Sequence, residues 1–445
     1  MYTATDGSPG TPPTETGREI RWILCIFGLA VAIRVLVGVV TTSWVFPSTD
    51  HFWQYGYEMG QIAASLSSGD GFSWPSWSAY PQGPTAWMAP IQPFLMGAAF
   101  KAFGAYSVRA AVAIELFQVV VSALSCVLLY FIGRRVFNAP TGLIAATLFA
   151  LYPPSIHFAV QKLWSTSLLA ACLLLLTLML LGLAARPDLR RGMRVGAVLG
   201  FTALVEPVVV AALPFVLVWL YWHAAGPSRM ILKTATGLMV AFCLVISPWL
   251  LRNYSVFGEF VFIKSNFGHE LFLGNNEYGG GGANQRGSSI RSAFAESGQD
   301  PWTRPEEPAF NRFLLHEAID FMADNPLQTA RSILTRVARY WTVMGPVNTW
   351  QEQLSLVTYL AILGLAGAGL FLTDLRNSGV QLLVVFLVSI PIPNYLTIVH
   401  HYRYRLPIEP FLVLLAAYAL YKLLERVWNR PHDRPPAPVR RRIHL

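Results

Sequence analysis

The sequence predicts an all-α polytopic membrane protein with about ten transmembrane helices, interfacial helices in a first outer loop, and a larger second outer loop. Hydrophobic residues make up 54% of its 445 residues and charged residues only 13%. This apolar content exceeds that of an ordinary soluble domain. The apolar residues are gathered in long runs, and the Lys and Arg residues cluster in short segments between some of them. Such clustering is typical of a protein oriented in a bilayer.

The transmembrane spans are predicted wherever an apolar stretch approaches the length that crosses a hydrocarbon core, roughly 17–25 residues. They fall at residues 21–43, 110–132, 139–157, 163–185, 194–208, 209–224, 231–251, 353–373, 378–396 and 404–424. The fifth and sixth are the shortest. The first span follows a polar tail and is long enough to cross, so we expect it to be a retained anchor.

The basic residues predict the orientation of the chain. The connections GRRVFN, RPDLRRGMR and GPSRMILK are rich in Arg and Lys, as is the C-terminal segment, whereas residues 35–100 contain neither. By the positive-inside rule we expect both termini to be cytoplasmic, in a multi-pass protein of the cell membrane. Residues 1–17 and 431–445 are Pro-rich and polar and are expected to be disordered tails around a transmembrane domain at 18–430.

Two outer loops follow from this topology, at residues 44–109 and 252–352. In the first, FWQYGYEMGQIAASL has apolar residues at three-to-four spacing, which predicts an interfacial helix, and MAPIQPFLMGAAFKAFG predicts a second one. The second loop contains a Gly-rich patch and then a helical stretch that should break at Asn325-Pro326, since proline disfavours a helical residue before it.

Composition excludes several other classes of protein. The net charge of +9 could suggest nucleic acid, but the basic residues lie between apolar runs, so we predict membrane lipids rather than nucleic acid as partners. The four cysteines lie within apolar runs without metal-ligand spacing and are expected to be small buried hydrophobic residues. No cysteine-based metal site is predicted.

Two carboxylates in the first outer loop are candidates for chemistry. Asp50 and Glu58 share one face of the expected helix with Gln54 and Gln61, opposite its apolar stripe. A carboxylate held beside a bilayer has its pKa raised toward the range where it can accept a proton from a hydroxyl group. Asp50 also fits a helix N-cap, and Glu58 also fits a water-facing position, so both interpretations stay open.

A second signal lies before the last span, where NYLTIVHHYRYRLPIEP places His401, Arg403 and Arg405 on the outer side. Short outer loops are normally poor in Arg. Two guanidinium groups there either pair with lipid headgroups or hold a specific anion such as a lipid phosphate, and we favour the phosphate, with Arg405 as its main ligand. Arg252 emerges on the same side and is a third candidate, or a cation reaching the headgroups from a helix end.

The remaining candidates are polar residues of the second loop and charges inside spans. GHELFLGNNEYGGGG offers His269, Glu270, Asn275 and Asn276 beside flexible glycines, a set that suits a hydroxyl-rich ligand and an ordinary loop equally well. Charges within spans are usually paired or line a cavity. They are Arg34, Glu115 and Glu206. The Glu206-Pro207 break either admits water or substrate, or Glu206 forms an internal ion pair with a residue such as Arg34.

Taken together, these segments resemble a known family. The acid-bearing helix, followed by IAASLSSGDGFS and GPTAWMAPIQPFLMGAAFKAFG, then SPWLLRNYSVFGEFVFIKSNFGHELFLGNN and HHYRYRLPIEPFLVLLAAYAL, is similar to bacterial GT-C glycosyltransferases. These are the relatives of dolichyl-phosphate-mannose protein mannosyltransferases and lipid A aminoarabinose transferases. The resemblance covers roughly residues 20–425. Its motifs are loose compared with a metal-ligand spacing.

The resemblance implies an inverting transfer of a sugar from a polyprenyl-phosphate donor to a glycan, lipid or protein acceptor at the outer face of the cytoplasmic membrane. It also implies an acid of the first outer loop as base. Where many relatives have adjacent Asp-Glu, Asp50 is followed here by His51, so Asp50 and Glu58 both remain candidates. No cofactor is predicted, and dependence on a divalent metal is left open.

Two other functions compete with this interpretation. A transporter or flippase of lipid-linked glycans would also use basic residues for phosphate, but the two large outer segments and the lack of an internal repeat argue against it. An assembly protein that binds lipid-linked sugars without chemistry is the third alternative. Transfer of labelled sugar from a polyprenyl-phosphate donor would distinguish the first function from both.

Overall fold

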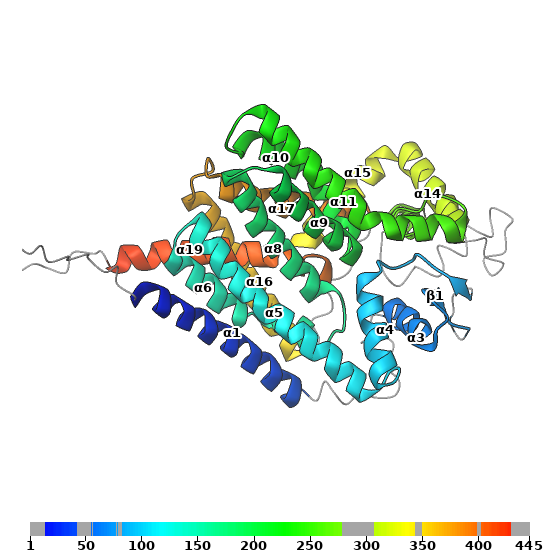
Figure 1. Ribbon diagram of the computed structural model, residues 1–445, viewed down its shortest axis with the longest axis horizontal. Coiled ribbons are helices and arrows are strands. Elements are labelled where there is room, and N and C mark those ends of the chain that lie inside the picture. Colours follow the sequence, from blue (N-terminus) through cyan, green and yellow to red (C-terminus); the bar gives the residue numbers. More distant parts are fainter. Residues whose placement is uncertain are drawn as a thin grey trace, which may run out of the picture.

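The computed structural model describes residues 14–41, 55, 57–76, 78, 82–277, 307–342, 349–397 and 402–428. Its long helices form a bundle, and shorter helices with one small hairpin lie at one end of that bundle (Figure 1). The start of α1 (Thr14–Val40) and the end of α19 (Glu409–Trp428) lie at the opposite end (Figure 1). An all-α polytopic fold with outer helices is therefore confirmed.

Among the described residues, seven segments are long and apolar enough to cross a membrane. They are α1, α5 (Val108–Val136), α8 (Thr166–Ala185), α11 (Ser228–Phe257), α16 (Trp350–Leu372), the segment of α17 (Ser378–Ser389) and α18 (Ile392–Leu396), and the segment of η3 (Tyr402–Tyr404), η4 (Leu406–Ile408) and α19. An eighth is the pair α6 (Ala139–Ala150) and α7 (Pro153–Val160), bent by 51°.

The predicted count of ten spans is not confirmed, and the difference lies in the fifth and sixth. The first of these is α9 (Leu189–Val205), a helix of 17 residues that begins with LRRGMR. The second is divided between η1 (Pro207–Ala212) and α10 (Leu213–His223). A 17-residue helix is about 25 Å long, at the lower limit for a helix that crosses a hydrocarbon core of about 30 Å. Small residues let α9 lie directly on α11: a Cβ on Gly196 would be 2.0 Å from the Leu238 carbonyl oxygen.

The bend between α6 and α7 is held by the buried Arg34 of α1. Its guanidinium donates to the carbonyl oxygens of Phe149 and Ala150, which end α6, and to the hydroxyls of Ser122 and Ser155. Carbonyls at a helix end lack partners within the helix, and in lipid they must find them elsewhere. Arg34 therefore supplies hydrogen bonds to the carbonyl groups at the break between α6 and α7. The alternative that it pairs with Glu206 is wrong.

Glu206 instead accepts from Lys264, with 3.2 Å between Oε1 and Nζ. Lys264 belongs to the segment that follows α11, so the charge at the Glu206-Pro207 break is matched by a residue of that segment. Glu115 of α5 is 2% exposed. Burial, and then the negative charge of Glu115, raise the pKa of Tyr55 above its ordinary value, which places these two side chains near each other.

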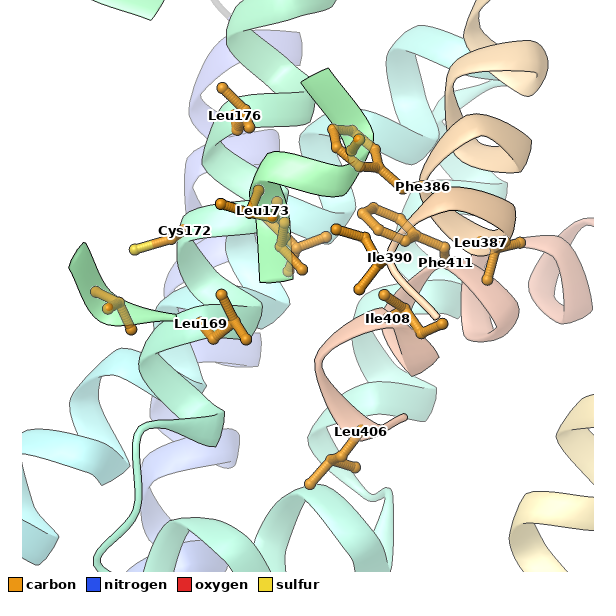
Figure 2. Close-up of a cluster of buried hydrophobic side chains, with 14 of the residues drawn as sticks. Leu169, Cys172, Leu173, Leu176, Phe386, Leu387, Ile390, Leu406, Ile408 and Phe411 are labelled. Atoms are coloured by element: carbon orange, nitrogen blue, oxygen red, sulfur yellow. The ribbon is translucent and has the colours of Figure 1, made fainter. Parts of the chain in front are cut away.

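The core of the bundle is continuous and apolar. Figure 2 shows Leu169, Cys172, Leu173 and Leu176 of α8 near α17 and the last helix. Phe386 and Phe411 are stacked with 5.6 Å between ring centroids. Cys126 and Cys172 are buried as expected, but the expectation fails for Cys25 and Cys243, which are exposed. An apolar run in a membrane helix can face lipid as well as protein, so hydropathy alone does not predict burial there.

The outer part begins with α3 (Glu58–Ser68), then the hairpin of β1 (Ser73–Trp74) and β2 (Gly83–Pro84), then α4 (Ile91–Phe103). From the second loop it includes α12 (Phe267–Gly274), α14 (Glu307–Asp324) and α15 (Pro326–Thr342). The break at Asn325-Pro326 and the helix at α4 are confirmed. The Gly-rich patch from residue 278 on lies outside the described residues.

Candidate functional site

Glu58 lies in the first turn of α3, and the helix begins there for a local reason. The preceding residue, Tyr57, has φ 40°, in the left-handed region that L-residues rarely adopt. One continuous helix over 50–66 is therefore wrong, because Tyr57 interrupts it. Such backbone strain persists only where the surroundings enforce it, often at functional sites. Asp50, the other candidate base, lies outside the described residues, as does His401.

The apolar stripe of the predicted helix is confirmed, but it faces protein. Tyr55 and Ile62 are fully buried and Met59 is 6% exposed. The ring of Tyr55 packs edge-on against Phe100 of α4, with centroids 5.2 Å apart. Gln61, expected on the polar face, is 1% exposed. The acid-bearing helix is thus fixed on α4, which holds the start of α3 in one place.

Arg403 is the basic residue that the structure brings near Glu58. Its guanidinium carbon is 4.3 Å from the centroid of the Trp164 ring and 4.8 Å from that of Tyr404, whose hydroxyl accepts one of its N–H groups at 3.0 Å. Glu58 and Glu270 both lie within electrostatic range of this guanidinium. Arg403 thus contacts the turn before α8, and the start of α3 lies in the same region of the structure.

His269 and Glu270 approach the same place from α12. The two side chains are 3.7 Å apart, between Nδ1 and Oε1, and are 14% and 27% exposed. The His269 ring packs edge-on against Trp87, with 4.9 Å between centroids, and lies 6.3 Å from the ring of Phe310. Aromatic rings with a carboxylate and an imidazole are suited to bind a sugar face and its hydroxyls.

Arg405 is placed differently from Arg403. It is 1% exposed, and its Nε donates at 2.7 Å to the carboxylate of Glu409, which is fully buried. A second nitrogen donates to the carbonyl oxygen of Tyr340, and its guanidinium carbon is 3.5 Å from the ring centroid of Tyr359. Glu409 also accepts from the Tyr152 hydroxyl at 2.7 Å. This ion pair joins α15, α16 and α19 in the core.

The remaining candidates make structural contacts. Arg252 donates to the carbonyl oxygens of Thr85 and Phe72, at 2.7 and 2.8 Å. Asn275 and Asn276 are 2% and 6% exposed and donate to backbone carbonyls of α12, and Asn275 also donates to the carbonyl oxygen of Leu396 at the end of α18.

Arg336 of α15 donates to the side chain of Asn275 and to the carbonyl oxygens of Gly274 and Tyr395. Burial lowers the pKa of Arg336 to about 10. These contacts fix α12 to α15 and α18, beside the site. Among the described residues, no group of three or more His, Cys, Asp or Glu side chains could hold a metal ion.

Sequence reasoning missed Trp164 and Lys162, which lie in the turn before α8. The predicted span 163–185 included Trp164, although a tryptophan at the end of a span is typical of the membrane interface. Lys162 lies within electrostatic range of His157. Both His157 and Tyr402 lie within range of Glu352, at the start of α16. Charged and aromatic side chains thus gather near the ends of several spans.

Comparisons with known proteins agree with this architecture. Residues 88–251 match the family model of dolichyl-phosphate-mannose-protein mannosyltransferase. The apo crystal structure of the Archaeoglobus fulgidus oligosaccharyltransferase matches with 16% identity and a TM-score of 0.54, covering 92% of this chain and 52% of that one. The same archaeal protein, in complex with an inhibitory peptide and a dolichol-phosphate, matches with 16% identity and a TM-score of 0.55, covering 93% and 52%.

A more distant match is ArnT from Cupriavidus metallidurans bound to undecaprenyl phosphate, with 13% identity and a TM-score of 0.41, covering 92% of this chain and 78% of that one. No curated protein sequence matches the chain. The chain spans about half the length of the archaeal oligosaccharyltransferase.

The bundle, the outer helices at one end of it and the shared fold define the class: this is a multi-pass helical membrane protein of the GT-C fold. Within that class, the match over residues 88–251 confirms the resemblance to the dolichyl-phosphate-mannose-protein mannosyltransferases that the sequence predicted.

Proposed function

We propose that this protein transfers a sugar, with inversion, from a polyprenyl-phosphate donor to an acceptor at the outer face of the cytoplasmic membrane. One observation carries the proposal: Glu58 and Arg403, 345 positions apart in the sequence, lie within electrostatic range of each other at the outer ends of the spans. A base for the acceptor and a cation for the donor phosphate are both needed at one place for this reaction.

The reaction divides between these two groups. The acceptor hydroxyl gives its proton to the carboxylate, and its oxygen forms a bond to the anomeric carbon of the sugar. The bond from that carbon to the phosphate oxygen breaks, and its electron pair leaves with the polyprenyl phosphate. A guanidinium beside this oxygen stabilises the charge that develops there. The aromatic rings of Trp164, Tyr404 and Trp87 are suited to exclude water and to pack on the sugar.

Glu58 is our first choice for the base, with Asp50 as the second candidate. Glu58 begins a helix whose position α4 fixes, and it shares the site with Arg403 and Glu270. For the phosphate, the geometry favours Arg403 over Arg405. The guanidinium of Arg405 already binds the buried Glu409 and the Tyr340 carbonyl, so contact with a phosphate would require it to leave them.

The classes of donor and acceptor are inferred from the archaeal structures. The archaeal oligosaccharyltransferase has been solved with a dolichol-phosphate and, separately, tethered to an acceptor peptide containing the NVT sequon. A shared fold at this level of identity supports a lipid-linked donor for this chain and leaves glycan, lipid and protein acceptors as candidates. His269 and Glu270 are the residues that we propose for sugar or acceptor contacts.

The test is transfer by the purified full-length protein. It is incubated with undecaprenyl-phosphate sugars carrying a radiolabel in the sugar, with membrane extracts as the source of acceptor. We expect release of undecaprenyl phosphate together with label in a new product, and loss of both in Glu58→Gln. Movement of the labelled lipid across vesicle membranes without cleavage would instead support the transporter.

A further inference from the structure

Glu307, the first residue of α14, binds the hairpin of the first outer loop. Each of its two carboxylate oxygens accepts two hydrogen bonds. Its Oε2 accepts from the indole N–H of Trp74 at 3.2 Å and from the hydroxyl of Thr85. Its Oε1 accepts from the backbone N–H of Ala86 at 2.7 Å and from the hydroxyl of Ser265. The four donors come from three places in the sequence, so one carboxylate joins the two outer loops.

Arg252 holds the same hairpin from the end of α11. It donates to the carbonyl oxygens of Phe72 and Thr85, which lie on the two sides of the hairpin, and it interacts electrostatically with Glu307. The backbone N–H of Ser265 donates to the carbonyl oxygen of Ala86 at 2.9 Å. Glu307 thus binds the hydroxyl of Thr85 and the backbone N–H of Ala86, while Arg252 and Ser265 bind the carbonyl oxygens of the same two residues.

The residues held by these contacts directly precede Trp87, which belongs to the candidate site. Trp87 follows Ala86 directly, is 5% exposed, and donates its backbone N–H to the Thr85 hydroxyl at 3.0 Å. Its indole packs against the ring of His269. Phe310, one turn after Glu307 on α14, lies 6.5 Å from Trp87 and 6.3 Å from His269, between ring centroids. The hairpin and α14 therefore enclose His269 from two sides.

We infer that Glu307 is a positioning residue: it locks the hairpin onto α14 and thereby sets the place of Trp87 against His269 in the site. The lock itself is a property of the fold. Its consequence for sugar transfer rests on the proposed function. Removal of the lock should free the Trp87 segment, because buried N–H groups left without acceptors favour a local opening toward water.

Glu307→Gln is the sharpest variant. Each carboxylate oxygen accepts one fixed N–H group and one hydroxyl that can rotate. An amide turns one oxygen into a donor, so in either orientation one fixed N–H group, that of Trp74 or that of Ala86, loses its acceptor. Glu317→Gln is the matched control, because Glu317 is exposed on the same helix.

The readout is carbethoxylation of His269 by diethyl pyrocarbonate, measured by mass spectrometry on the purified full-length protein. His269 is 14% exposed, whereas His316, on α14, is exposed and serves as the internal reference. In Glu307→Gln we expect labelling of His269 to rise several-fold relative to His316, with a smaller rise in Thr85→Val and none in Glu317→Gln. Labelling of His269 at the wild-type rate in Glu307→Gln would overturn the lock.

The activity readout separates positioning from general damage. Turnover of Glu307→Gln should fall on the order of tenfold or more, as small displacements of site residues do, while the affinity for undecaprenyl phosphate stays unchanged because the lock does not reach Arg403. Unchanged turnover with a more reactive His269 would refute the positioning role. If the wild-type protein itself transfers no sugar, the proposed function fails, and His269 labelling still decides whether the lock exists.

Discussion

Arg403 stacks on Trp164, with its guanidinium carbon 4.3 Å from the ring centroid, and a second ring, that of Tyr404, lies 4.8 Å from the same carbon. Two rings and the hydrogen bond to the Tyr404 hydroxyl fix the plane of the guanidinium. A cation over an aromatic face gains about 0.5–2 kcal/mol, more as water is excluded. Arg403 is therefore oriented before any ligand arrives, which favours a planar, two-bond contact with phosphate.

Replacement of Arg403 by Lys should weaken binding of undecaprenyl phosphate about tenfold while leaving the thermal unfolding midpoint unchanged. The charge stays, but the planar fork and its stacking on Trp164 are lost. Native mass spectrometry with added undecaprenyl phosphate measures the affinity. Arg339→Lys, an exposed position of α15, is the control. If Arg405→Lys weakened binding and Arg403→Lys did not, Arg405 would be the phosphate ligand, as the sequence predicted.

Glu58→Gln should reduce sugar transfer by about 10²–10⁴-fold with the protein still folded, because the amide keeps the size of the side chain and cannot accept the proton. Initial rates with a labelled donor give the loss, and thermal unfolding monitors the fold. Asp70→Asn is the matched control, since Asp70 is exposed just after the end of α3. If Glu58→Gln transferred sugar at the normal rate and Asp50→Asn did not transfer it, Asp50 would be the base.

The ion pair of Arg405 and Glu409 should matter for stability more than a surface pair. Glu409→Gln should lower the free energy of unfolding by about 3–5 kcal/mol, because it leaves a buried guanidinium without its counter-charge. Glu425→Gln, in a pair with Lys422 whose side chains are about one-third exposed, should cost much less, because ion pairs in contact with solvent contribute little to stability. Thermal or denaturant unfolding in detergent compares the two. Equal losses would show that Arg405 finds another partner, a lipid phosphate included.

The predicted orientation can be tested with single cysteines in a background without Cys25 and Cys243, the two exposed cysteines. Ser76→Cys, on the exposed hairpin loop, should react with a membrane-impermeant maleimide on intact cells. Arg190→Cys, exposed at the start of α9, should react only after the membrane is opened. Reaction of Arg190→Cys from outside would reverse the topology, and with it the side on which Glu58 and Arg403 act.

Much of the fold could be predicted from the sequence because the signals are local. Long apolar runs predict spans wherever the chain must satisfy its backbone within lipid, and eight of the ten predicted spans correspond to long helices or to the bent pair. Pro326 predicts the break between α14 and α15. The two predicted spans that are not confirmed are short and join at Glu206-Pro207, where α9 ends and η1 begins.

The pairing of Arg405 with Glu409 was also within reach of the sequence, since residues four apart share a helix face. The four-residue spacing is present in the sequence, and both residues lie within the predicted span 404–424. The spacing does not predict that the side chains of Arg405 and Glu409 are buried. Both side chains lie in the core because α15 and α16 pack over them through Tyr340 and Tyr359.

The sequence by itself determined the membrane class, most of the spans, and the presence of acids and arginines on one predicted side, since each depends on a residue and its near neighbours. Only the tertiary structure decided which of them meet. Glu58 lies within electrostatic range of Arg403, 345 positions away, and Glu307 binds Thr85 and Ala86, more than 220 positions away. Such contacts depend on how helices pack against one another, and that packing is set by the shapes of many side chains together rather than by any local pattern.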